Sequence, residues 1–517
     1  MVQETDLVQK KASATDNNPQ LKKILADADK KLRAERLAPR FPYGSVARPY
    51  QTEAYENWVA NDYSGIFAMA TGTGKTITAL NCLLNEYRKS GVYQAVIVVP
   101  TGSLVTQWNG ELALFNMRKN IILVSSKYDW QKPIGNLLSE IKRENESFVI
   151  ICTYASFYRE KFQNVFKKLP KDTFFIADEA HNIGFPKVLE VLPSVHLTKR
   201  IGLSATPKRI YDEEGSLQME YFFKDKEPYT YSFSMERAID EGREGAPLCA
   251  YYYYPHIVTL TDTEYTEYME ISKKLAKFFT KDNDLVKKGI VERLLLARKR
   301  IIHKAENKLG VVREILQKHL EVHGKLNYTF VYVPEGNTQF EEDLDDEENK
   351  KTITHHLIEV YNNEIQKLNR YLKVVSFTGE TPNKVGILSD FAQGKIDVLT
   401  SMKCLDEGVD VPKTQMAIFC SSTGNPRQFI QRRGRVLRKP KDGSKHTATI
   451  HDLVVVPQIA ENSDLFSLER SLVTKELERV AHFAFMAKNR YEAIGELSEI
   501  CAHYNLNLHT IHENLSH

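Results

Sequence analysis

The sequence has few cysteines, and none of them are paired. The six cysteines form no Cys-x-x-Cys motif and are scattered along the 517 residues, at Cys82, Cys152, Cys249, Cys404, Cys420 and Cys501. Structural zinc sites, iron–sulfur clusters and disulfide frameworks all depend on paired or clustered cysteines. The sequence therefore argues against all three and fits a reducing compartment.

Long apolar runs are also missing. No run approaches the roughly 20 apolar residues that a membrane span needs, and the N-terminal stretch MVQETDLVQKKASATD has no apolar core typical of a secretory signal. We therefore expect a soluble protein of the cytoplasm or another intracellular compartment, with no membrane partner.

A strong charge of either sign is absent too. The chain has 70 Lys and Arg against 67 Asp and Glu, for a net charge of +3, so any surface that binds nucleic acid must be local. A PD…(D/E)xK nuclease cluster is not evident either, so nuclease activity would have to come from a partner protein. The length exceeds that of one hydrophobic core and predicts two or three domains.

Two stretches of the chain alternate short apolar runs with longer segments at helical spacing. In the first stretch the apolar runs occupy residues 95–100, 148–154, 174–179 and 200–206. In the second they occupy residues 326–333, 373–379, 397–401, 416–422 and 449–456. Buried strands that alternate with helices indicate parallel sheets built from βαβ units. We therefore predict an α/β protein with two tandem parallel-sheet domains.

The domain boundaries follow from these patterns. We expect a polar N-terminal extension, a first domain, a hinge with a basic helical insert, a second domain and a helical C-terminal extension, over residues 1–40, 41–225, 226–304, 305–457 and 458–517. The extension has a helical pattern over residues 20–37. The basic helical segment 270–325 is either a nucleic-acid clamp or a packed interdomain insert. The C-terminal helices are interpreted as a brace for the second domain, with a partner surface as the alternative.

Two unusual runs have ordinary interpretations. The tyrosine-rich stretch AYYYYPHIV (250–258) could stack on bases, but we interpret it as a strand and hinge that pack between domains. The acidic stretch EEDLDDEE (341–348) is interpreted as a mobile surface loop.

The sharpest local motif is MATGTGKT at residues 69–76. Its two glycines let backbone N–H groups converge on phosphate oxygens at the start of a helix. Lys75 can reach the β- and γ-phosphates, and the Thr76 hydroxyl can bind Mg²⁺. Met69 stands where the full phosphate-loop pattern has a glycine, and a chance glycine turn is the alternative. The candidate nucleotide-binding residues are Ala70, Thr71, Gly72, Thr73, Gly74, Lys75 and Thr76.

A second motif supplies carboxylates. In FFIADEAH (174–181) an apolar strand leads into Asp178 and Glu179, and ligands of an open parallel sheet bind at the carboxyl ends of its strands. Asp178 is therefore predicted to hold Mg²⁺ together with Thr76. Glu179 is predicted to orient and deprotonate the attacking water. A solvated loop start is the alternative, which the phosphate loop disfavours.

Asp-Glu-Ala-His belongs to a set of ordered motifs that resembles the superfamily-two helicases and translocases of the DEAH type. The other segments that carry the resemblance are ARPYQ (47–51), VVPTGSLVTQW (98–108), TYASF (153–157), SAT (204–206), CLDEGVDVP (404–412) and QRRGRVLR (431–438). The sequences of these segments resemble those of the XPB-like and type III restriction subunit-like branch, whose members act mostly on double-stranded DNA.

The resemblance implies roles for further residues. It implies that Gln51 reads the adenine edge, that Gly408 and Asp410 approach the nucleotide, and that a nucleic-acid backbone is bound near Thr101, Gln107, Thr153 and Thr206. It also implies two RecA-like domains with one ATP between them.

The same resemblance divides the arginines of QRRGRVLR by role. Arg435 and Arg438 match the positions of arginine fingers, which stabilise charge on the transferred phosphoryl group. Their spacing predicts one helical face, with Gln431 one turn earlier. Arg432, Arg433 and Lys439 lie outside the matched positions, so we interpret them as basic surface.

The sequence therefore predicts a nucleic-acid-dependent ATPase that uses ATP and Mg²⁺ to translocate on DNA and unwind it, with double-stranded DNA as the favoured partner. Two alternatives stay open. One is a double-stranded-nucleic-acid translocase or ATP-gated sensor that does not separate strands, as the motor of a repair, restriction or antiviral complex. The other is an inactive nucleic-acid-binding scaffold, which would not need Lys75, Asp178, Glu179 and both finger arginines.

Overall fold

The structure is a computed structural model that describes residues 28, 36–143, 145–209, 212–239, 245–279, 285–334, 347–402, 411–420, 426–440, 442–457 and 466–516. The chain divides into two compact units. One comprises Met1–Phe67 and Lys75–Ser232, and the other comprises Ala68–Gly74 and Phe233–His517. Gly408, Asp410 and most of the predicted segments 20–37 and 341–348 lie outside the described residues.

The first unit is built on a seven-stranded sheet. Its strands are β1 (Ser64–Met69), β2 (Gln94–Val99), β3 (Ile121–Val124), β4 (Phe148–Thr153), β5 (Phe174–Asp178), β6 (Lys199–Ser204) and β7 (Tyr231–Phe233), in the spatial order β3-β4-β2-β5-β6-β1-β7. Parallel pairing joins β3 to β4, β4 to β2, β2 to β5 and β5 to β6. The parallel sheet predicted from the apolar runs is confirmed.

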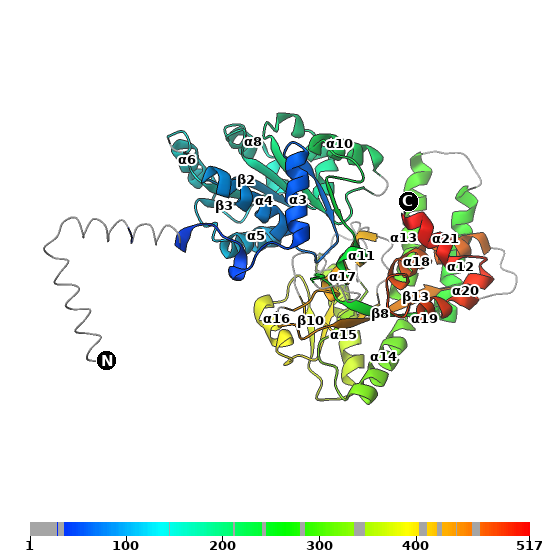
Figure 1. The fold of residues 1–517 in the computed structure, drawn as a ribbon. Coiled ribbons are helices and arrows are strands. Elements are labelled where there is room, and N and C mark those ends of the chain that lie inside the picture. The colour runs from blue at the N-terminus through cyan, green and yellow to red at the C-terminus, as the bar shows by residue number, and fades with distance from the viewer. Residues whose placement is uncertain are drawn as a thin grey trace, which may run out of the picture. The chain divides into compact units, whose positions relative to one another are not determined.

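Helices cover both faces of this sheet (Figure 1). They are α3 (Pro49–Ala60), α4 (Lys75–Ser90), α5 (Gly102–Leu114), α6 (Gln131–Glu140), α7 (Tyr154–Phe157), α8 (Glu160–Phe166), α9 (Pro186–Leu189) and α10 (Glu213–Phe223), with the short 3₁₀ turns η1 (Pro42–Gly44), η2 (Ala180–Gly184) and η3 (Leu192–Ser194). Val96 and Val98 of β2 are buried in one core, and Ile97 between them is buried on the other face. Strands buried on both faces explain the continuous apolar runs of the sequence.

The second unit is built on a six-stranded parallel sheet. Its strands are β8 (Ala250–Thr259), β9 (Thr329–Tyr332), β10 (Val374–Phe377), β11 (Val398–Ser401), β12 (Met416–Phe419) and β13 (Thr447–Val456), in the order β10-β11-β9-β12-β13-β8. Every neighbouring pair in this order is parallel. The second parallel-sheet domain is therefore confirmed.

The strand β8 places the start of this sheet earlier than the sequence predicted. The tyrosine-rich run is a strand, as expected, but it pairs with β13 along its whole length instead of forming a hinge. It is the edge strand of the sheet, where Pro255, which lacks an N–H donor, is tolerated. Because three helices separate β8 from β9 in the sequence, the sequence pattern did not indicate that the two strands belong to one sheet.

The predicted helical insert packs against the same sheet. The helices of this unit are α11 (Met235–Ala238), α12 (Asp262–Phe279), α13 (Leu285–Lys304), α14 (Lys308–His323), α15 (Glu347–Gln366), α16 (Lys384–Ala392), α17 (Pro426–Val436), α18 (Phe466–Ala484), α19 (Arg490–Gly495), α20 (Ser498–His503) and α21 (Leu508–Ser516). Leu275 of α12 and Ile302 of α13 are buried in one core with Val331 and Ile418 of the sheet. The packed-insert interpretation of this segment is therefore the better supported one.

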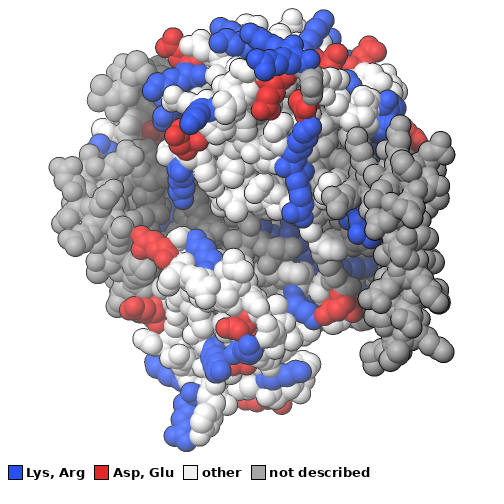
Figure 2. Space-filling model, turned by 90° about the vertical axis from the view of Figure 1, so that its left-hand side faces the viewer, with Lys and Arg blue, Asp and Glu red and all other residues white. Residues whose placement is uncertain are grey.

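The surface is charged but mixed. Figure 2 shows Lys and Arg side chains interspersed with Asp and Glu on the face that it presents. Within the described part of the chain, no helix is both long enough and apolar enough to cross a bilayer.

Candidate functional site

The candidate phosphate loop joins β1 to α4. The strand ends at Met69 and the helix begins at Lys75, as the sequence predicted. Gly72 and Gly74 have φ angles of 88° and 86°, a region that disfavours any residue with a Cβ. The Thr73 hydroxyl donates a hydrogen bond of 2.7 Å to the carbonyl of Ala70 and closes the turn. The loop thus leads directly into the N-terminus of α4, where an anion is favourable.

Two further features of this loop suit a phosphate ligand. The hydroxyl of Thr71 is buried, and no hydrogen-bond partner for it exists among the described residues. The charge of Lys75 acts on the Asp178 carboxyl and lowers its pKa, so the lysine and the carboxylate share one electrostatic environment. A buried hydroxyl and a lysine at a helix N-terminus form a suitable donor set for phosphate oxygens.

Asp178 is the last residue of the buried strand β5. Its Oδ2 accepts a hydrogen bond of 2.8 Å from the indole Nε1 of Trp108, and its Oδ1 accepts one of 3.0 Å from the backbone N–H of Glu179. Burial raises the pKa of the Asp178 carboxyl, while the Trp108 bond, the Lys75 charge and the Glu179 N–H lower it. These three interactions favour the ionised form against the cost of burial.

Glu179 has left-handed backbone geometry, with a φ of 47°. Such strain in a residue other than glycine is typical of functional sites. The carbonyl of Glu179 accepts a hydrogen bond of 2.9 Å from the Asn182 amide, and its Oε2 lies 3.6 Å from His181 Nδ1. His181 Nδ1 is also 3.4 Å from the hydroxyl of Ser204. The DEAH and SAT segments are therefore in contact.

The donor set fits a magnesium ion that arrives with a nucleotide. Within the described ranges, no group of three or more His, Cys, Asp or Glu side chains is arranged to hold a metal. Carboxylate and hydroxyl oxygens of the kind that Asp178 and Thr76 offer are ligands that Mg²⁺ accepts, and the ion usually keeps phosphate oxygens and waters in its remaining positions. Protein ligands alone would be too few for a permanent metal site.

Gln51 already has a structural role. Its side-chain Oε1 accepts a hydrogen bond of 2.9 Å from the backbone N–H of Arg48 and caps the start of α3. The residue is buried. Contact between Gln51 and an adenine ring stays a prediction.

Three of the four residues that the resemblance assigned to nucleic acid lie at one edge of the sheet. Thr153 ends β4, Thr101 and Thr206 follow β2 and β6, and Gln107 lies on α5. Since β4 and β6 run parallel to their neighbours, these ends share the edge that carries Asp178. The Thr153 hydroxyl accepts a hydrogen bond of 3.2 Å from the Ser156 N–H and caps α7. Contact of the four residues with nucleic acid stays a prediction.

Arg435 and Arg438 were predicted to lie on one helical face, but the structure places only Arg435 on a helix. Gln431 and Arg435 lie one turn apart on α17, but the helix ends at Val436. Arg438 lies beyond this end, in a bridge with Leu248, and the neighbouring Cys249 N–H donates to the carbonyl of Leu437. The backbone of Leu437 and Arg438 is therefore paired with that of Leu248 and Cys249 and does not continue the helix.

The interpretation of Arg432 and Arg433 as basic surface is wrong. Both side chains are buried, at 2% and 0% exposure. Arg432 lies over the ring of Tyr332, and Arg433 lies over the ring of Phe483 on α18. A guanidinium can stack on aromatic faces, and a short basic sequence run does not reveal that the neighbouring rings exist.

Lys445 was not predicted as a structural residue from the sequence. Its ammonium group is buried and donates hydrogen bonds to the carbonyls of Val436, Arg438 and Pro412, the last two at 3.2 and 3.4 Å. A cation is favourable at the carboxyl end of a helix, here α17. No sequence signal identified this lysine, because these three carbonyls belong to the backbone and leave no mark in the sequence.

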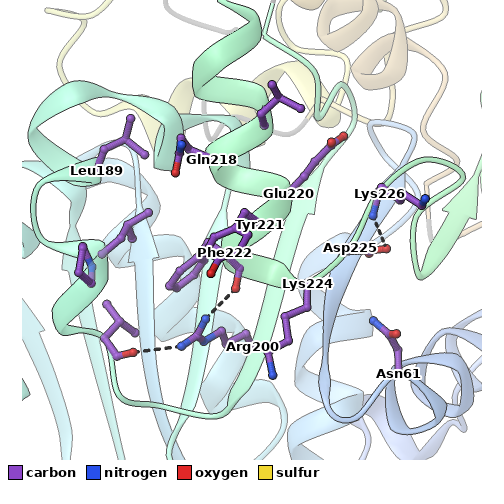
Figure 3. A pocket seen from close by; sticks show the side chains of 14 residues that line it. Asn61, Leu189, Arg200, Gln218, Glu220, Tyr221, Phe222, Lys224, Asp225 and Lys226 are labelled. Atoms are coloured by element: carbon purple, nitrogen blue, oxygen red, sulfur yellow. Dashed lines mark hydrogen bonds between the residues drawn. The ribbon is translucent and has the colours of Figure 1, made fainter.

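A large pocket in the first unit is separate from these residues. It has a volume of about 1270 Å³ and is lined by residues near the start of β6, by α10 and by the segment around η3. Figure 3 shows Arg200 within it, and its guanidinium donates to the carbonyls of Phe222 and Val195 at 2.7 and 3.0 Å. Arg200 lies at the opposite end of β6 from Ser204, and none of the predicted site residues lines the pocket.

Two protein families match the segments that carry the site. Residues 45–209 match the family described as "Type III restriction enzyme, res subunit", and residues 340–440 match "Helicase conserved C-terminal domain". The first range contains the phosphate loop and Asp178, and the second contains α17.

Several curated proteins similar to this chain are named as translocases or helicases. The "DNA 3'-5' translocase XPB2" of Sulfurisphaera tokodaii is 28% identical over 402 residues, which cover 76% of this chain and 78% of that protein. "Putative helicase 22" of a Sulfolobus islandicus filamentous virus is 23% identical over 81% of this chain and 65% of that protein. The "Putative DNA 3'-5' helicase Rad25" of Halobacterium salinarum is 23% identical over 76% of this chain, which spans about half of that relative.

A solved structure shares the fold. The "ATP-dependent Type ISP restriction-modification enzyme LlaBIII bound to DNA" aligns with 86% of this chain and 31% of its own, at a TM-score of 0.53 and 18% identity. The ordered motifs, the two parallel-sheet domains and these matches agree, and together they support a superfamily-two helicase similar to the XPB-like or restriction-subunit-like branch.

Proposed function

We propose that this protein is an ATP-dependent motor that translocates on double-stranded DNA and unwinds it. One observation carries the proposal. At the carboxyl edge of one sheet, a phosphate loop with two positive-φ glycines shares its electrostatic environment with the buried, oriented carboxylate of Asp178. A structural protein has no need for this arrangement, whereas phosphoryl transfer depends on it.

In the proposed reaction, Lys75 and the amides of residues 72–76 bind the β- and γ-phosphates. Asp178 and Thr76 would hold Mg²⁺, which would offset the negative charge of the phosphates. Glu179 orients a water molecule and accepts its proton while the oxygen bonds to the γ-phosphorus. The bond from that phosphorus to the β–γ bridging oxygen breaks, and ADP leaves. Arg435 and Arg438 are the proposed source of positive charge for the transition state.

The proposed track is double-stranded DNA. Two observations support this choice, since one relative is named a DNA 3'-5' translocase and the protein of similar fold is bound to DNA. Thr101, Gln107, Thr153 and Thr206 are the proposed contacts with the phosphate backbone. Backbone contacts do not depend on base sequence, which suits a motor that moves along any DNA. A nuclease or another protein partner is proposed for any cleavage.

Translocation without strand separation is a second candidate. The name of the translocase relative favours it, and the same residues would serve both activities. An ATP-gated sensor of double-stranded nucleic acid, within a repair, restriction or antiviral complex, belongs to this candidate. An inactive scaffold is disfavoured because it would have no need for Lys75, Asp178 and Glu179, all of which the sequence contains.

The test is steady-state ATP hydrolysis with no nucleic acid, single-stranded DNA, double-stranded DNA and double-stranded RNA. We expect the largest stimulation with double-stranded DNA, and loss of turnover in Lys75→Ala and Glu179→Gln. Lys168→Ala, which changes an exposed lysine outside the motifs, serves as the control and should retain wild-type turnover. Stimulation by RNA alone would contradict the DNA assignment, and hydrolysis that survives Lys75→Ala would contradict the proposed site.

A further inference from the structure

Helix α5 and its N-cap include residues that are predicted to contact nucleic acid. The helix also includes a direct hydrogen-bond partner of Asp178, the carboxylate predicted to bind magnesium. Thr101 precedes the helix as its N-cap, and Gln107 lies on it. Trp108 follows Gln107 and is 1% exposed. Its indole Nε1 lies 2.8 Å from Asp178 Oδ2. A single hydrogen bond thus connects the helix expected to contact DNA with the carboxylate expected to bind Mg²⁺.

This hydrogen bond helps to fix the orientation of the carboxylate. The Glu179 N–H binds Oδ1 from the following residue, and Trp108 binds Oδ2 from a helix 70 residues earlier in the chain. A carboxylate held at both oxygens has little freedom to rotate, and a shift of α5 would move one of its two partners. Hydrogen bonds to metal ligands of this kind tune metal affinity.

Trp108 does more than fill space. A buried aromatic ring alone would satisfy the packing around α5, and a phenylalanine could supply it. The indole N–H instead points at a buried ionisable group that it favours in the charged form. The buried side-chain oxygen of Gln107, the residue before it, has no hydrogen-bond partner among the described residues. The polar atoms of this turn are therefore not arranged for packing alone.

We propose that Trp108 is a positioning residue that couples nucleic-acid binding on α5 to magnesium binding at Asp178. The inference rests on the proposed function, since it assumes that both ligands bind where that function needs them. When DNA binds α5, the helix shifts or stiffens, and the indole hydrogen bond transmits this change to the carboxylate. DNA then raises the affinity of the site for the metal–nucleotide complex, and by linkage the metal–nucleotide complex raises the affinity for DNA.

The experiment compares Trp108→Phe with Tyr154→Phe. The Tyr154 hydroxyl donates a hydrogen bond of 2.9 Å to the backbone carbonyl of Asp178, so its removal affects the same residue but leaves the carboxylate untouched. Electron paramagnetic resonance of Mn²⁺, with a non-hydrolysable ATP analogue, measures metal affinity with and without a DNA duplex.

We expect DNA to tighten Mn²⁺ binding in the wild type and in Tyr154→Phe. In Trp108→Phe, Mn²⁺ affinity should fall by about tenfold and its response to DNA should disappear. Tyr154→Phe also removes a buried hydrogen bond to Asp178, so it controls for a general loss of packing at this residue.

Unchanged Mn²⁺ affinity and an unchanged DNA response in Trp108→Phe would overturn the inference. If this variant does not fold, Trp108→benzothienylalanine keeps the shape of the ring and removes only the N–H, and the same two outcomes decide. A protein that binds Mn²⁺ and nucleotide but never hydrolyses ATP would contradict the proposed function. Metal binding would still test the role of Trp108 in that case.

Discussion

Arg433 on α17 donates a hydrogen bond of 2.7 Å from its guanidinium to the backbone carbonyl of His482 on α18. Its guanidinium lies 4.8 Å from the centre of the Phe483 ring, and Tyr251 of β8 is within 3.4 Å of the same nitrogen. An arginine of the QRRGRVLR segment therefore holds the C-terminal helix against the second sheet. This contact supports the interpretation of the C-terminal helices as a brace.

Because Arg433 makes these contacts, replacing it should lower the stability of the protein by an amount that depends on the new side chain. Arg433→Ala leaves a cavity and removes the bond to His482, so the free energy of unfolding should fall by roughly 2–5 kcal/mol. Arg433→Met should cost less, because it fills most of the space and removes two buried nitrogens, Nε and Nη2, that lack hydrogen-bond partners among the described residues. Denaturant unfolding measures both, with Arg490→Ala at an exposed arginine as the control. Equal losses in the Ala and Met variants would show that charge, not packing, dominates.

We expect Lys445 to stabilise the carboxyl end of α17. Lys445→Met leaves several buried carbonyls without a donor, and we expect a loss of about 2–4 kcal/mol in unfolding free energy. Lys445→Arg should not restore it, since a planar guanidinium cannot replace a compact ammonium group among backbone carbonyls. Lys413, which pairs with exposed Asp442, provides the control, and Lys413→Met should change stability little. Full stability of Lys445→Met would refute the role as a helix cap.

The arginine fingers should affect turnover more than binding. Replacing Arg435 or Arg438 by Ala should lower kcat by about 10³-fold or more, with little change in KM for ATP, because a finger acts mainly on transition-state charge. Lys439→Ala, next to the motif but outside it, is the matched control and should retain turnover. A rise in KM at constant kcat would instead assign the arginines to ground-state binding.

The second domain should lose stability in acid through a histidine cluster. His256 Nε2 lies 2.9 Å from His451 Nδ1, at a cavity of about 320 Å³ lined also by Tyr254 of β8, Thr449 of β13, and Glu314, Lys318, His319 and His323 of α14. Burial, with the neighbouring His256 and His319, lowers the pKa of His451 to about 3, and burial also lowers the pKa of His256.

The sign of the pH effect follows from these directions. The unfolded chain has histidine pKa values near 6.5 and binds more protons below that pH, so stability is complete above about pH 6.5 and falls as the pH drops toward 3. The slope is about 1.4 kcal/mol per pH unit for each histidine that stays neutral. His451→Gln should flatten the dependence of unfolding free energy on pH between 5 and 6. An identical slope in the variant would exclude His451 as the cause.

Much of the fold was predictable because its strands are buried on both faces. The apolar runs at 95–100, 174–179 and 200–206 contain most of β2, β5 and β6, and the loop before Lys75 was placed by its glycines. These signals are local, since the strand pattern, the glycines and the helix start lie within a few residues of one another.

The missed features depend on residues that are distant in the sequence. Arg433 is buried because Phe483 and Tyr251 cover it, and Lys445 is buried because three carbonyls surround it. The strand β8 joins its sheet across three helices. The bond from Trp108 to Asp178 requires α5 to lie against the end of β5. No pattern in one sequence reports such pairings, which arise only when the chain folds.

The central claim is that ATP hydrolysis moves this protein along DNA, and displacement of a third strand from a DNA triplex tests it most directly. A translocating motor removes the third strand from a blunt duplex without opening the duplex, while a forked duplex in parallel reports unwinding. We predict ATP- and Mg²⁺-dependent displacement that is lost in Glu179→Gln. Robust duplex-stimulated ATP hydrolysis without displacement of the third strand would contradict the motor and would favour an ATP-gated sensor.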